Sequence, residues 1–319
     1  MNLIVTSAGR RNQLIECFRE DAERLGIPLR VLAVDRHPQS SPACLQADAR
    51  FAAPHCTAKD YVPHLLEICA KHEIGMLVPT IDPELVVLSE HRAKFAAIGT
   101  QVVVSLPDVV ALCQDKLGTA QRLAAAGIAT PKTLTLADYL RDPSALSQPV
   151  IAKPNSGSAS FGIIRPKAPG ELAVLDPEGY IVQELWQGRE YTVNVFFDRA
   201  GQLHCAIPHE RVEVRAGEVS KGVTRRIPAL EDAAQKLAAV LPGARGPLCF
   251  QAIVAPSGEI AVFEINGRFG GGFPLAHRAG ARMAQWLLEE ASDRSLSAHN
   301  DWRAGVTMLR YDAAVFFDE

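Results

Sequence analysis

The sequence lacks any apolar run of about 18 residues, the length that a membrane-spanning helix needs. The N-terminus enters directly into a predicted strand, Asn2 to Thr6, without the longer apolar region and cleavage site of a signal peptide. The net charge is −3 at pH 7, which argues against a broad positive surface for nucleic acid. We therefore expect a cytoplasmic protein that binds neither a membrane nor nucleic acid.

Paired cysteines of the kind that bind metals or form disulfides are also absent. The seven cysteines are scattered without a Cys-x-x-Cys pair, and the nine histidines show no ligand spacing. This pattern is typical of reduced thiols in the cytoplasm, and it argues against a zinc site or a disulfide framework.

Several catalytic and nucleotide-binding signatures are missing as well. The sequence has neither the Gly-Lys-Ser/Thr ending of a Walker A loop nor an obvious Ser/His/Asp or Cys/His constellation. The segment 7–11 (Ser-Ala-Gly-Arg-Arg) ends the first predicted strand, but it is not a Gly-x-Gly-x-x-Gly loop. A nicotinamide dehydrogenase is therefore disfavoured, although Asp35 ends the second predicted strand.

The apolar content of 48% is ordinary for a globular protein. A chain of 319 residues is longer than a single hydrophobic core usually accommodates, so we expect two or three packed units. Residues 1–107 alternate between strand and helix patterns. The predicted strands are 3–6, 29–34, 75–78 and 101–105, and the predicted helices are 12–25, 61–72 and 84–98. This alternation predicts an α/β unit with a parallel sheet covered on both faces.

The second half shows a different pattern. After predicted helices at 107–113 and 116–126, strand patterns cluster and hairpins dominate, so this part is predicted to be α+β with antiparallel strands. The predicted strands are 150–153, 162–165, 180–184, 191–197, 204–208, 219–227, 249–255 and 259–265, with 305–317 at the end. Further helices are expected at 230–241 and 274–292.

The segment 264–268 (Glu-Ile-Asn-Gly-Arg) carries the strongest functional signal. Because strand side chains alternate between faces, Glu264, Asn266 and Arg268 would share one face. Ile265 would point into the core behind them. A carboxylate, an amide oxygen and a guanidinium side by side are suited to hold Mg²⁺ against phosphate oxygens and to neutralise the remaining charge.

The preceding strand, 249–255, supplies a further candidate ligand. If Ser257 and Gly258 form a two-residue hairpin loop, Gln251 pairs with Glu264, roughly 5 Å away between Cβ atoms. Gln251, Glu264 and Asn266 are then candidate Mg²⁺ ligands, and three glycines follow at 270–272, where backbone can approach a ligand closely. The alternative is a plain hairpin with a polar outer face.

Lysines in two places are candidate phosphate ligands. Lys153 ends the predicted strand 150–153, and a loop of small residues follows that can fold over a ligand with its N–H groups pointing inward. The candidates in this loop are Ser156, Gly157, Ser158, Ser160 and Gly162. Lys116 begins a helix, where the dipole and the cation both attract an anion. A plain solvent loop and a surface lysine are the alternative interpretations.

The predicted strand 180–184 turns polar at its end, at Gln183 and Glu184, and Leu185 follows it. Exposed backbone amides there would pair with an adenine edge, and the carboxylate of Glu190 would bind ribose hydroxyls. Without other context, this segment is a generic hairpin.

A basic cluster indicates where a second substrate would bind. Its members are Arg211, Arg215, Lys221, Arg225 and Arg226. A carboxylate substrate or an acyl phosphate needs such cations, so Lys221 and Arg225 are candidate catalytic residues. Arg10 and Arg11 would face the same cleft, and His209 or Glu210 would accept a proton from an incoming amine. A solvated charged hairpin is an equally good interpretation.

Taken in order, these residues resemble the ATP-grasp superfamily. The residues that carry the resemblance are Lys116, the segment 152–154, the Ser/Gly loop, the segment 183–185, Glu190, Gln251 and the segment 264–268. Within it, the chain most resembles the synthetase units of the carbamoyl-phosphate synthase large subunit and stand-alone carboxylate–amine ligases similar to it. Many ATP-grasp enzymes carry an acidic residue at the position of Gln251, whereas the carbamoyl-phosphate synthase type carries glutamine. The segment 78–84 also resembles the one that closes the pre-ATP-grasp domain in this group.

The resemblance implies a fold: a Rossmann-like pre-ATP-grasp domain at 1–107 and an ATP-grasp domain at 108–319, with a lid subdomain at about 118–185. It also implies ATP and Mg²⁺ as cofactors. Lys116 and Lys153 would contact the α- and β-phosphates, and the loop from Ser156 to Gly162 would close over them. Glu184 and Leu185 would present backbone groups to adenine. The remaining roles are ribose binding by Glu190, metal binding by Gln251, Glu264 and Asn266, and phosphoryl-group stabilisation by Arg268.

The implied reaction joins a small-molecule carboxylate to an amine. The carboxylate attacks the γ-phosphate of ATP to give an acyl phosphate, and the amine then displaces phosphate to give an amide. Phosphoryl transfer depends on positioning and charge neutralisation, so it needs no side-chain nucleophile. The alternatives are a phosphotransferase on the same fold and a non-catalytic nucleotide-binding protein. If the amine is ammonia from glutamine, a separate glutaminase partner would have to supply it. If the protein forms an oligomer, a homodimer is expected, because dimers are the commonest oligomers.

Overall fold

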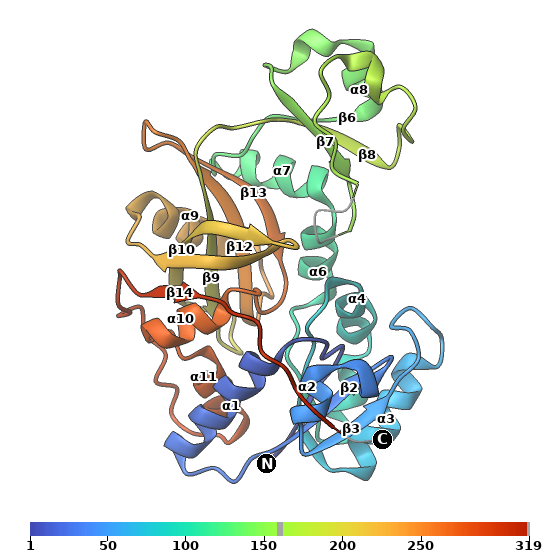
Figure 1. The fold of residues 1–319 in the computed structure, drawn as a ribbon, viewed down its shortest axis with the longest axis vertical. Coiled ribbons are helices and arrows are strands. Elements are labelled where there is room, and N and C mark those ends of the chain that lie inside the picture. Colours follow the sequence, from blue (N-terminus) through green and yellow to red (C-terminus); the bar gives the residue numbers. More distant parts are fainter. Residues whose placement is uncertain (158–161, 318–319) are drawn as a thin grey trace.

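The computed structural model describes residues 1–157 and 162–317, so the predicted loop residues Ser158 and Ser160 lie outside the described part of the chain. The chain forms an N-terminal body around one sheet, a larger body around a second sheet, and a small lobe that projects from the top in Figure 1. Among the described residues, no helix combines the length and apolar character needed to cross a bilayer.

Five parallel strands in the order β3-β2-β1-β4-β5 form the sheet of the N-terminal body. The strands are β1 (Asn2–Val5), β2 (Arg30–Asp35), β3 (Ala49–Ala52), β4 (Ile74–Val78) and β5 (Gln101–Val102). The helices of this body are α1 (Asn12–Leu25), α2 (Pro42–Gln46), α3 (Tyr61–Lys71), α4 (Asp82–Glu90) and α5 (Arg92–Ala96). The predicted parallel sheet is confirmed, and its central side chains, such as Ile4 and Leu77, are fully buried.

Six strands in the order β13-β12-β9-β10-β11-β14 form the sheet of the larger body, and their pairings are antiparallel. The strands are β9 (Arg189–Phe197), β10 (Leu203–Arg215), β11 (Glu218–Thr224), β12 (Gly246–Val254), β13 (Ile260–Asn266) and β14 (Thr307–Leu309). Its helices are α6 (Pro107–Gln114), α7 (Lys116–Ala125), α9 (Pro228–Val240), α10 (Phe273–Ala279) and α11 (Met283–Ala291). The predicted antiparallel second half is confirmed.

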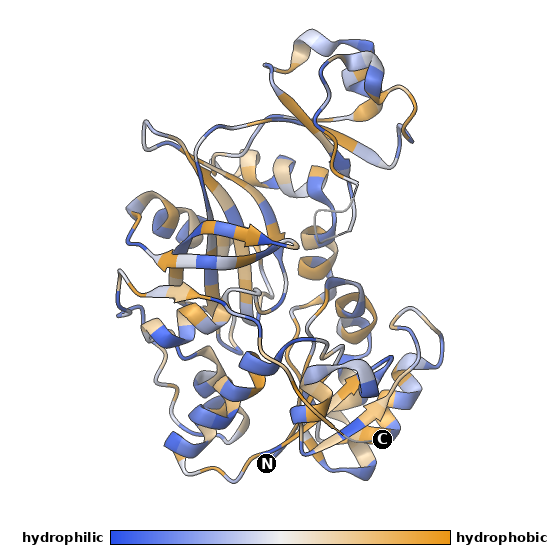
Figure 2. Ribbon diagram, in the orientation of Figure 1, coloured by the Kyte–Doolittle hydropathy of each residue, from blue (hydrophilic) through white to orange (hydrophobic). Residues whose placement is uncertain are grey.

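The small lobe has its own three-stranded sheet and its own core. Its elements are β6 (Thr133–Thr135), α8 (Leu136–Arg141), β7 (Val150–Pro154) and β8 (Tyr180–Glu184), in the sheet order β6-β8-β7. Leu136, Tyr139 and Val182 are buried together between the helix and the sheet. In Figure 2 the lobe carries hydrophobic and hydrophilic segments side by side, as expected for a thin layer with one buried face. This lobe lies within the segment 118–185 that the sequence predicts as a lid.

The two larger bodies share a hydrophobic core. Phe18 of α1 packs against Phe269, with ring centroids 6.0 Å apart, and both belong to a cluster that includes Trp286 of α11. Asp21 of α1 is fully buried, and its Oδ2 accepts a hydrogen bond from the backbone N of Gln285 at 2.8 Å. The lower part of the larger body is therefore fixed to the N-terminal body, and the side chains between them have fixed positions.

The hairpin formed by β12 and β13 pairs Gln251 with Glu264, as predicted, but by a different route. The loop is longer than the predicted two residues, because Ala255 N donates to Glu259 O and the ladder begins at Val254 and Ile260. A β-bulge between Gln251 and Ala252 then restores the predicted register. The longer loop and the bulge therefore compensate each other, and Gln251 still lies opposite Glu264.

Other differences arise where local patterns are interrupted. The predicted helix 274–292 is divided into α10 and α11, because Gly280 takes a φ of +113° and ends α10. The predicted strand 162–165 contributes only an isolated bridge between Ile164 and Ala152. At the end of the chain, only Thr307–Leu309 of the predicted strand 305–317 joins the sheet. The short elements β3, α2, β6 and α8 were not predicted.

Candidate active site

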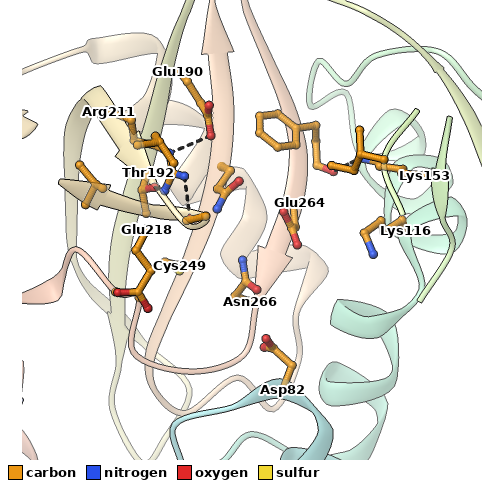
Figure 3. Close-up of a pocket in the computed structure, with 18 of the residues that line it drawn as sticks. Asp82, Lys116, Lys153, Glu190, Thr192, Arg211, Glu218, Cys249, Glu264 and Asn266 are labelled. Atoms are coloured by element: carbon orange, nitrogen blue, oxygen red, sulfur yellow. Dashed lines mark hydrogen bonds and ion pairs between the residues drawn. The ribbon is translucent and has the colours of Figure 1, made fainter. Parts of the chain in front are cut away.

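A cavity of about 920 Å³ opens between the small lobe, the six-stranded sheet and the N-terminal body. The predicted residues that line it are Lys116, Lys153, Ser156, Gly157, Gln183, Glu184, Leu185, Glu190, Gln251, Glu264, Asn266 and Arg268. Arg10 and Arg11, at the end of β1, line it as well. Arg10 and Arg268, which are 258 positions apart in the sequence, therefore line the same space, part of which is drawn in Figure 3.

Lys153 is the most buried cation of the site. It lies near the end of β7, its side chain approaches β13, and its Nζ is 3.5 Å from Phe263 O and 5.4 Å from the centroid of the Phe263 ring. Burial lowers the pKa of Lys153 to about 8, since the negative charge of Glu264 only partly compensates for the loss of water. A phosphate group bound here would replace the missing counter-charge.

Lys116 begins α7, where the sequence placed it, and it is tied to the Ser/Gly loop. Its Nζ donates to Gly157 O at 2.7 Å, and its backbone N donates to Asn155 O at 3.1 Å. Burial lowers the pKa of Lys116, while Glu264 and Asp82 act in the opposite direction. The described start of the loop is thus connected to a cation that faces the same cavity as Lys153.

Glu264, Asn266 and Gln251 bring three side-chain oxygens to the cavity wall, from the two strands of one hairpin. Burial raises the pKa of Glu264, and the charges of Lys153 and Lys116 oppose that rise. Within the described residues, the carboxylate of Glu264 accepts no hydrogen bond from any protein donor. A largely buried carboxylate without a donor, beside two amide oxygens, fits a hard divalent cation such as Mg²⁺.

No cluster of three or more His, Cys, Asp or Glu side chains suitable for a metal occurs in the described part of the chain. The Mg²⁺ candidates include a single carboxylate, because position 251 holds glutamine. Asp82, at the start of α4, adds a second carboxylate to the cavity wall (Figure 3). The site therefore combines one strand carboxylate with another from the N-terminal body.

Arg268 is held between the two bodies. Its Nη2 donates to Asp82 Oδ2 at 2.8 Å, and its Nη1 donates to Phe269 O at 3.0 Å. Burial alone would lower the pKa of Arg268, but Asp82 reverses this effect and raises it. The guanidinium therefore stays charged beside Asn266, whose Oδ1 lies 3.4 Å from Nη2.

Glu184, Leu185 and Glu190, which are predicted to contact adenine and ribose, also line the cavity. The backbone N of Glu184 donates to Lys132 O at 3.0 Å, and that of Leu185 donates to Pro149 O at 2.8 Å. These two N–H groups are thus already used, so they do not serve an adenine in this arrangement. Glu190 forms an ion pair with Arg211, with Oε1 and Nε 2.8 Å apart, as the dashed lines in Figure 3 show.

Lys221 and Arg225 do not line this cavity, which corrects the prediction of a catalytic role for them. Lys221 pairs across the hairpin with Glu213, at 2.7 Å, and half of each side chain is exposed. Arg225 lies just after β11 and approaches Glu210 at 3.7 Å. The sequence placed both on a ligand-binding face, but the face they occupy points to solvent and to neighbouring carboxylates.

Gly162 is also absent from the cavity wall. It has a φ of +73°, and a Cβ at this position would come within 2.9 Å of Pro154 and of the Tyr180 hydroxyl. Glycine is therefore required for backbone conformation and close packing beside β7 and β8, rather than for contact with a ligand.

His209 is not placed to accept a proton from a substrate, contrary to prediction. It is fully buried behind the cavity, and Asn194 Nδ2 donates to its Nδ1 at 3.3 Å. Burial, with the nearby charges of Arg211 and Arg310, lowers the pKa of His209 to about 3. The imidazole is therefore neutral at physiological pH and shielded from substrate.

Three charged residues meet instead where Arg11 and Glu218 form part of the cavity wall. Glu218 binds Arg11 at 2.6 Å and Arg310 at 3.0 Å, and both Arg11 and Glu218 line the cavity. Burial alone would raise the pKa of Glu218, but Arg11 and Arg310 hold it below its usual value. Neither Glu218 nor Arg310 was predicted, because they come from segments whose local pattern shows only an edge strand and an extended end.

Comparison with known proteins places this arrangement in a family. A model described as "ATP-grasp domain" matches residues 113–272, which is half of the chain. The chain belongs to the ATP-grasp family. A second model, described as "PylC-like, N-terminal domain", matches residues 3–103. No curated protein sequence matched this chain significantly.

Solved structures share the fold at low sequence identity. Biotin carboxylase from Campylobacter jejuni, solved with β,γ-ATP, has a TM-score of 0.75 at 14% identity, over 95% of this chain and 73% of the other. N5-carboxyaminoimidazole ribonucleotide synthetase from Thermotoga maritima has a TM-score of 0.68 at 17% identity, over 93% and 77%. L-amino acid ligase from Bacillus licheniformis has a TM-score of 0.68 at 18% identity, over 95% and 77%.

The family membership confirms the predicted fold class and the predicted resemblance. ATP-grasp enzymes use ATP with Mg²⁺ to ligate a carboxylate to a nucleophile, so the predicted enzyme class and cofactors hold for this chain. The oxygen ligands and buried lysines described above are compatible with that cofactor pair. The assignment of individual residues, the domain limits at 107 and 118–185 and the closer likeness to carbamoyl-phosphate synthase remain predictions.

Proposed function

We propose that this protein is an ATP-dependent carboxylate–amine ligase that releases ADP and phosphate and works through an acyl phosphate. The observation that carries the proposal is the meeting of Lys116, Lys153, Glu264 and Arg268 around one cavity, with Asn266 and Gln251 beside them. When bound, Mg²⁺ would be held by Gln251, Glu264 and Asn266, and it would neutralise phosphate charge.

The cations divide the work of phosphoryl transfer by position. Lys116 and Lys153 bind the α- and β-phosphates, since both flank the Ser/Gly loop and face Glu264 across the cavity. Arg268 stabilises the charge that develops as the γ-phosphoryl group moves to the substrate carboxylate. Asp82 holds the guanidinium of Arg268 in place, so little conformational entropy is lost when substrate binds.

The second substrate region lies beyond Arg268, at Arg10, Arg11 and Glu218. The arginines attract the carboxylate that receives the phosphoryl group. The glycines at 270–272 leave room there, because a Cβ at Gly271 would lie 2.8 Å from the Glu218 side chain. Glu218 keeps the Arg11 guanidinium in place there through their ion pair at 2.6 Å.

The proposal includes a cytoplasmic location, where ATP and Mg²⁺ are available, and a homodimer. The biotin carboxylase domain of 2-oxoglutarate carboxylase from Hydrogenobacter thermophilus was solved as a dimer. Light scattering after size-exclusion chromatography would give the mass of the assembly directly.

The test is ADP release measured across a panel of carboxylates with and without amines. We expect release that depends on a specific carboxylate and yields an amide when an amine is present. Glu264→Ala should abolish release while the circular dichroism spectrum stays unchanged. ADP release that never responds to an amine would indicate a phosphotransferase, and tight ATP binding without turnover would indicate a regulatory protein. Full activity of Glu264→Ala would reject the assignment.

A further inference from the structure

A second cavity, of about 580 Å³, lies between the N-terminal body and the larger body. It shares no lining residue with the nucleotide cavity. Its walls come from α5 and β5 on one side, and from α11 and the start of β12 on the other. The charged side chains that line it are Arg92, Arg199, Arg245 and Glu290.

Two of these arginines lack a counter-charge in the described part of the chain. Arg199 is engaged, since its Nη2 donates to Gln101 Oε1 at 2.9 Å and its Nη1 lies 3.4 Å from Asp293. Glu290 is engaged as well, because its Oε1 accepts a hydrogen bond from the backbone N of Arg199 at 2.8 Å. By contrast, the guanidinium groups of Arg92 and Arg245 form no ion pair and no hydrogen bond among the described residues; Arg245 bonds Ser105 through its backbone only.

Arg92 and Arg245 carry the same charge and line the same cavity. Arg92 is partly buried, and burial lowers its pKa, which the positive charge of Arg245 lowers further. Like charges held in a partly dry cavity cost free energy that an anion between them would recover. The cavity also offers apolar surface from Val102 and Leu287, which suits a ligand larger than a bare ion.

The backbone holds Arg245 firmly in place against the N-terminal body. Its N donates to Ser105 Oγ at 3.1 Å, and the nearby Gly243 O accepts from Leu106 N at 3.0 Å. Gly246 has a φ of +69°, and a Cβ there would lie 2.9 Å from Val103 Cγ1. This junction leaves little space for the strand to move, so the backbone that carries Arg245 has a fixed position beside the cavity.

We propose that Arg92 and Arg245 form a binding site for a phosphate group, distinct from the ATP site. Each guanidinium presents a planar fork of N–H donors that matches phosphate oxygens, and together the two neutralise a dianion. The cavity volume accommodates a small phosphorylated metabolite as well as free phosphate. Because one arginine comes from each body, the bound group ties α5 to the start of β12.

The first test uses inorganic phosphate and ribose 5-phosphate on the full-length protein, with Mg²⁺ and a non-hydrolysable ATP analogue at saturation to block the nucleotide site. We expect either probe to raise the Tm by roughly 2–4 °C, and Arg92→Gln/Arg245→Gln to lose this rise. The matched control, Arg141→Gln/Arg278→Gln, removes the same charge elsewhere and keeps the rise. A response only to ribose 5-phosphate identifies a metabolite site, and a response to both identifies a general phosphate site.

An unchanged Tm of the wild type, or an equal rise in the Arg92/Arg245 variant, overturns the proposal. A second measurement does not depend on how well the variant folds. Wild-type crystals that contain the ATP analogue are soaked in tungstate, and an anomalous peak is expected within hydrogen-bonding distance of both guanidiniums. A peak at the nucleotide cavity only, or none at all, would contradict the site.

Discussion

The Nη2 atom of Arg268 lies 2.8 Å from Oδ2 of Asp82, although the two residues are 186 positions apart in the chain. Asp82 begins α4 of the N-terminal body, and Arg268 follows β13 of the larger body. Both side chains are largely buried, at 16% and 15% exposure, so solvent screens this ion pair little. The N-terminal body therefore has a direct part in holding the residue proposed to act on the γ-phosphoryl group.

Replacing Asp82 tests that part. Asp82→Asn should lower kcat by about 10-fold, because the amide keeps the shape but no longer holds the guanidinium by charge. The KM for ATP should stay the same or fall, since a negative charge near the phosphates is removed. Steady-state kinetics checks both values, with Asp82→Ala as the more severe variant. An unchanged kcat in both variants would show that Arg268 needs no such partner.

Lys153 gives a pH prediction. With a pKa of about 8 in the free protein, Lys153 loses its proton as the pH rises through 8, so ATP affinity should fall from pH 7.5 to 9.5. Bound phosphate should raise this pKa, so binding near pH 8.5 should take up a proton. Calorimetry in buffers of different ionisation enthalpy measures the uptake. Lys153→Met should bind more weakly and lose both effects, whereas an identical pH profile in the variant would exclude Lys153 as their source.

Gln251 allows a gain-of-affinity test. Gln251→Glu adds a second carboxylate directly across from Glu264, so the Mg²⁺ concentration for half-maximal activity should fall by about 10-fold. Gln251→Met, which removes the oxygen, should raise that concentration. Titration of activity with Mg²⁺ at fixed ATP compares the three proteins. Equal Mg²⁺ dependence in all three would remove Gln251 from the metal site.

Variants of Arg11 and Lys221 compare a cation that lines the cavity with one that was predicted to bind substrate but does not line it. Arg11→Gln should raise the KM of the carboxylate substrate by about 10-fold, because it removes a cation that lines the cavity. Lys221→Gln should leave kcat/KM within about two-fold, since it breaks only an exposed pair with Glu213. The reverse order of effects would mean that the substrate approaches from the outer hairpin face.

The sequence predicted those parts of the site that depend on local alternation and neighbouring strands. Strand periodicity and a turn signal were enough to pair Gln251 with Glu264, even though the loop and the bulge differed from expectation. Lys221, by contrast, was chosen for its charge, and in the structure the bulges between β10 and β11 place it opposite Glu213. Alternation within one strand does not reveal which face a third segment will cover.

Contacts between segments far apart in the chain could not be predicted from the sequence either. Arg310 reaches Glu218 only because the last strand, β14, pairs with β11, and no local pattern near residue 310 announces that pairing. The buried position of His209 likewise depends on its packing beneath the glycines at 270–272, where a Cβ at Gly272 would lie 2.5 Å from its Nε2. Such placements follow from tertiary packing rather than from residue type or spacing.

The proposed function depends most on the oxygens of Gln251, Glu264 and Asn266, which we propose hold a divalent ion against the nucleotide. Electron paramagnetic resonance of Mn²⁺, titrated into the protein with a non-hydrolysable ATP analogue, measures this ion directly. We expect saturable, nucleotide-dependent Mn²⁺ binding by the wild type, and an affinity at least about 10-fold weaker for Glu264→Gln. Equal Mn²⁺ affinity in the two proteins, or binding that does not depend on the nucleotide, would contradict it.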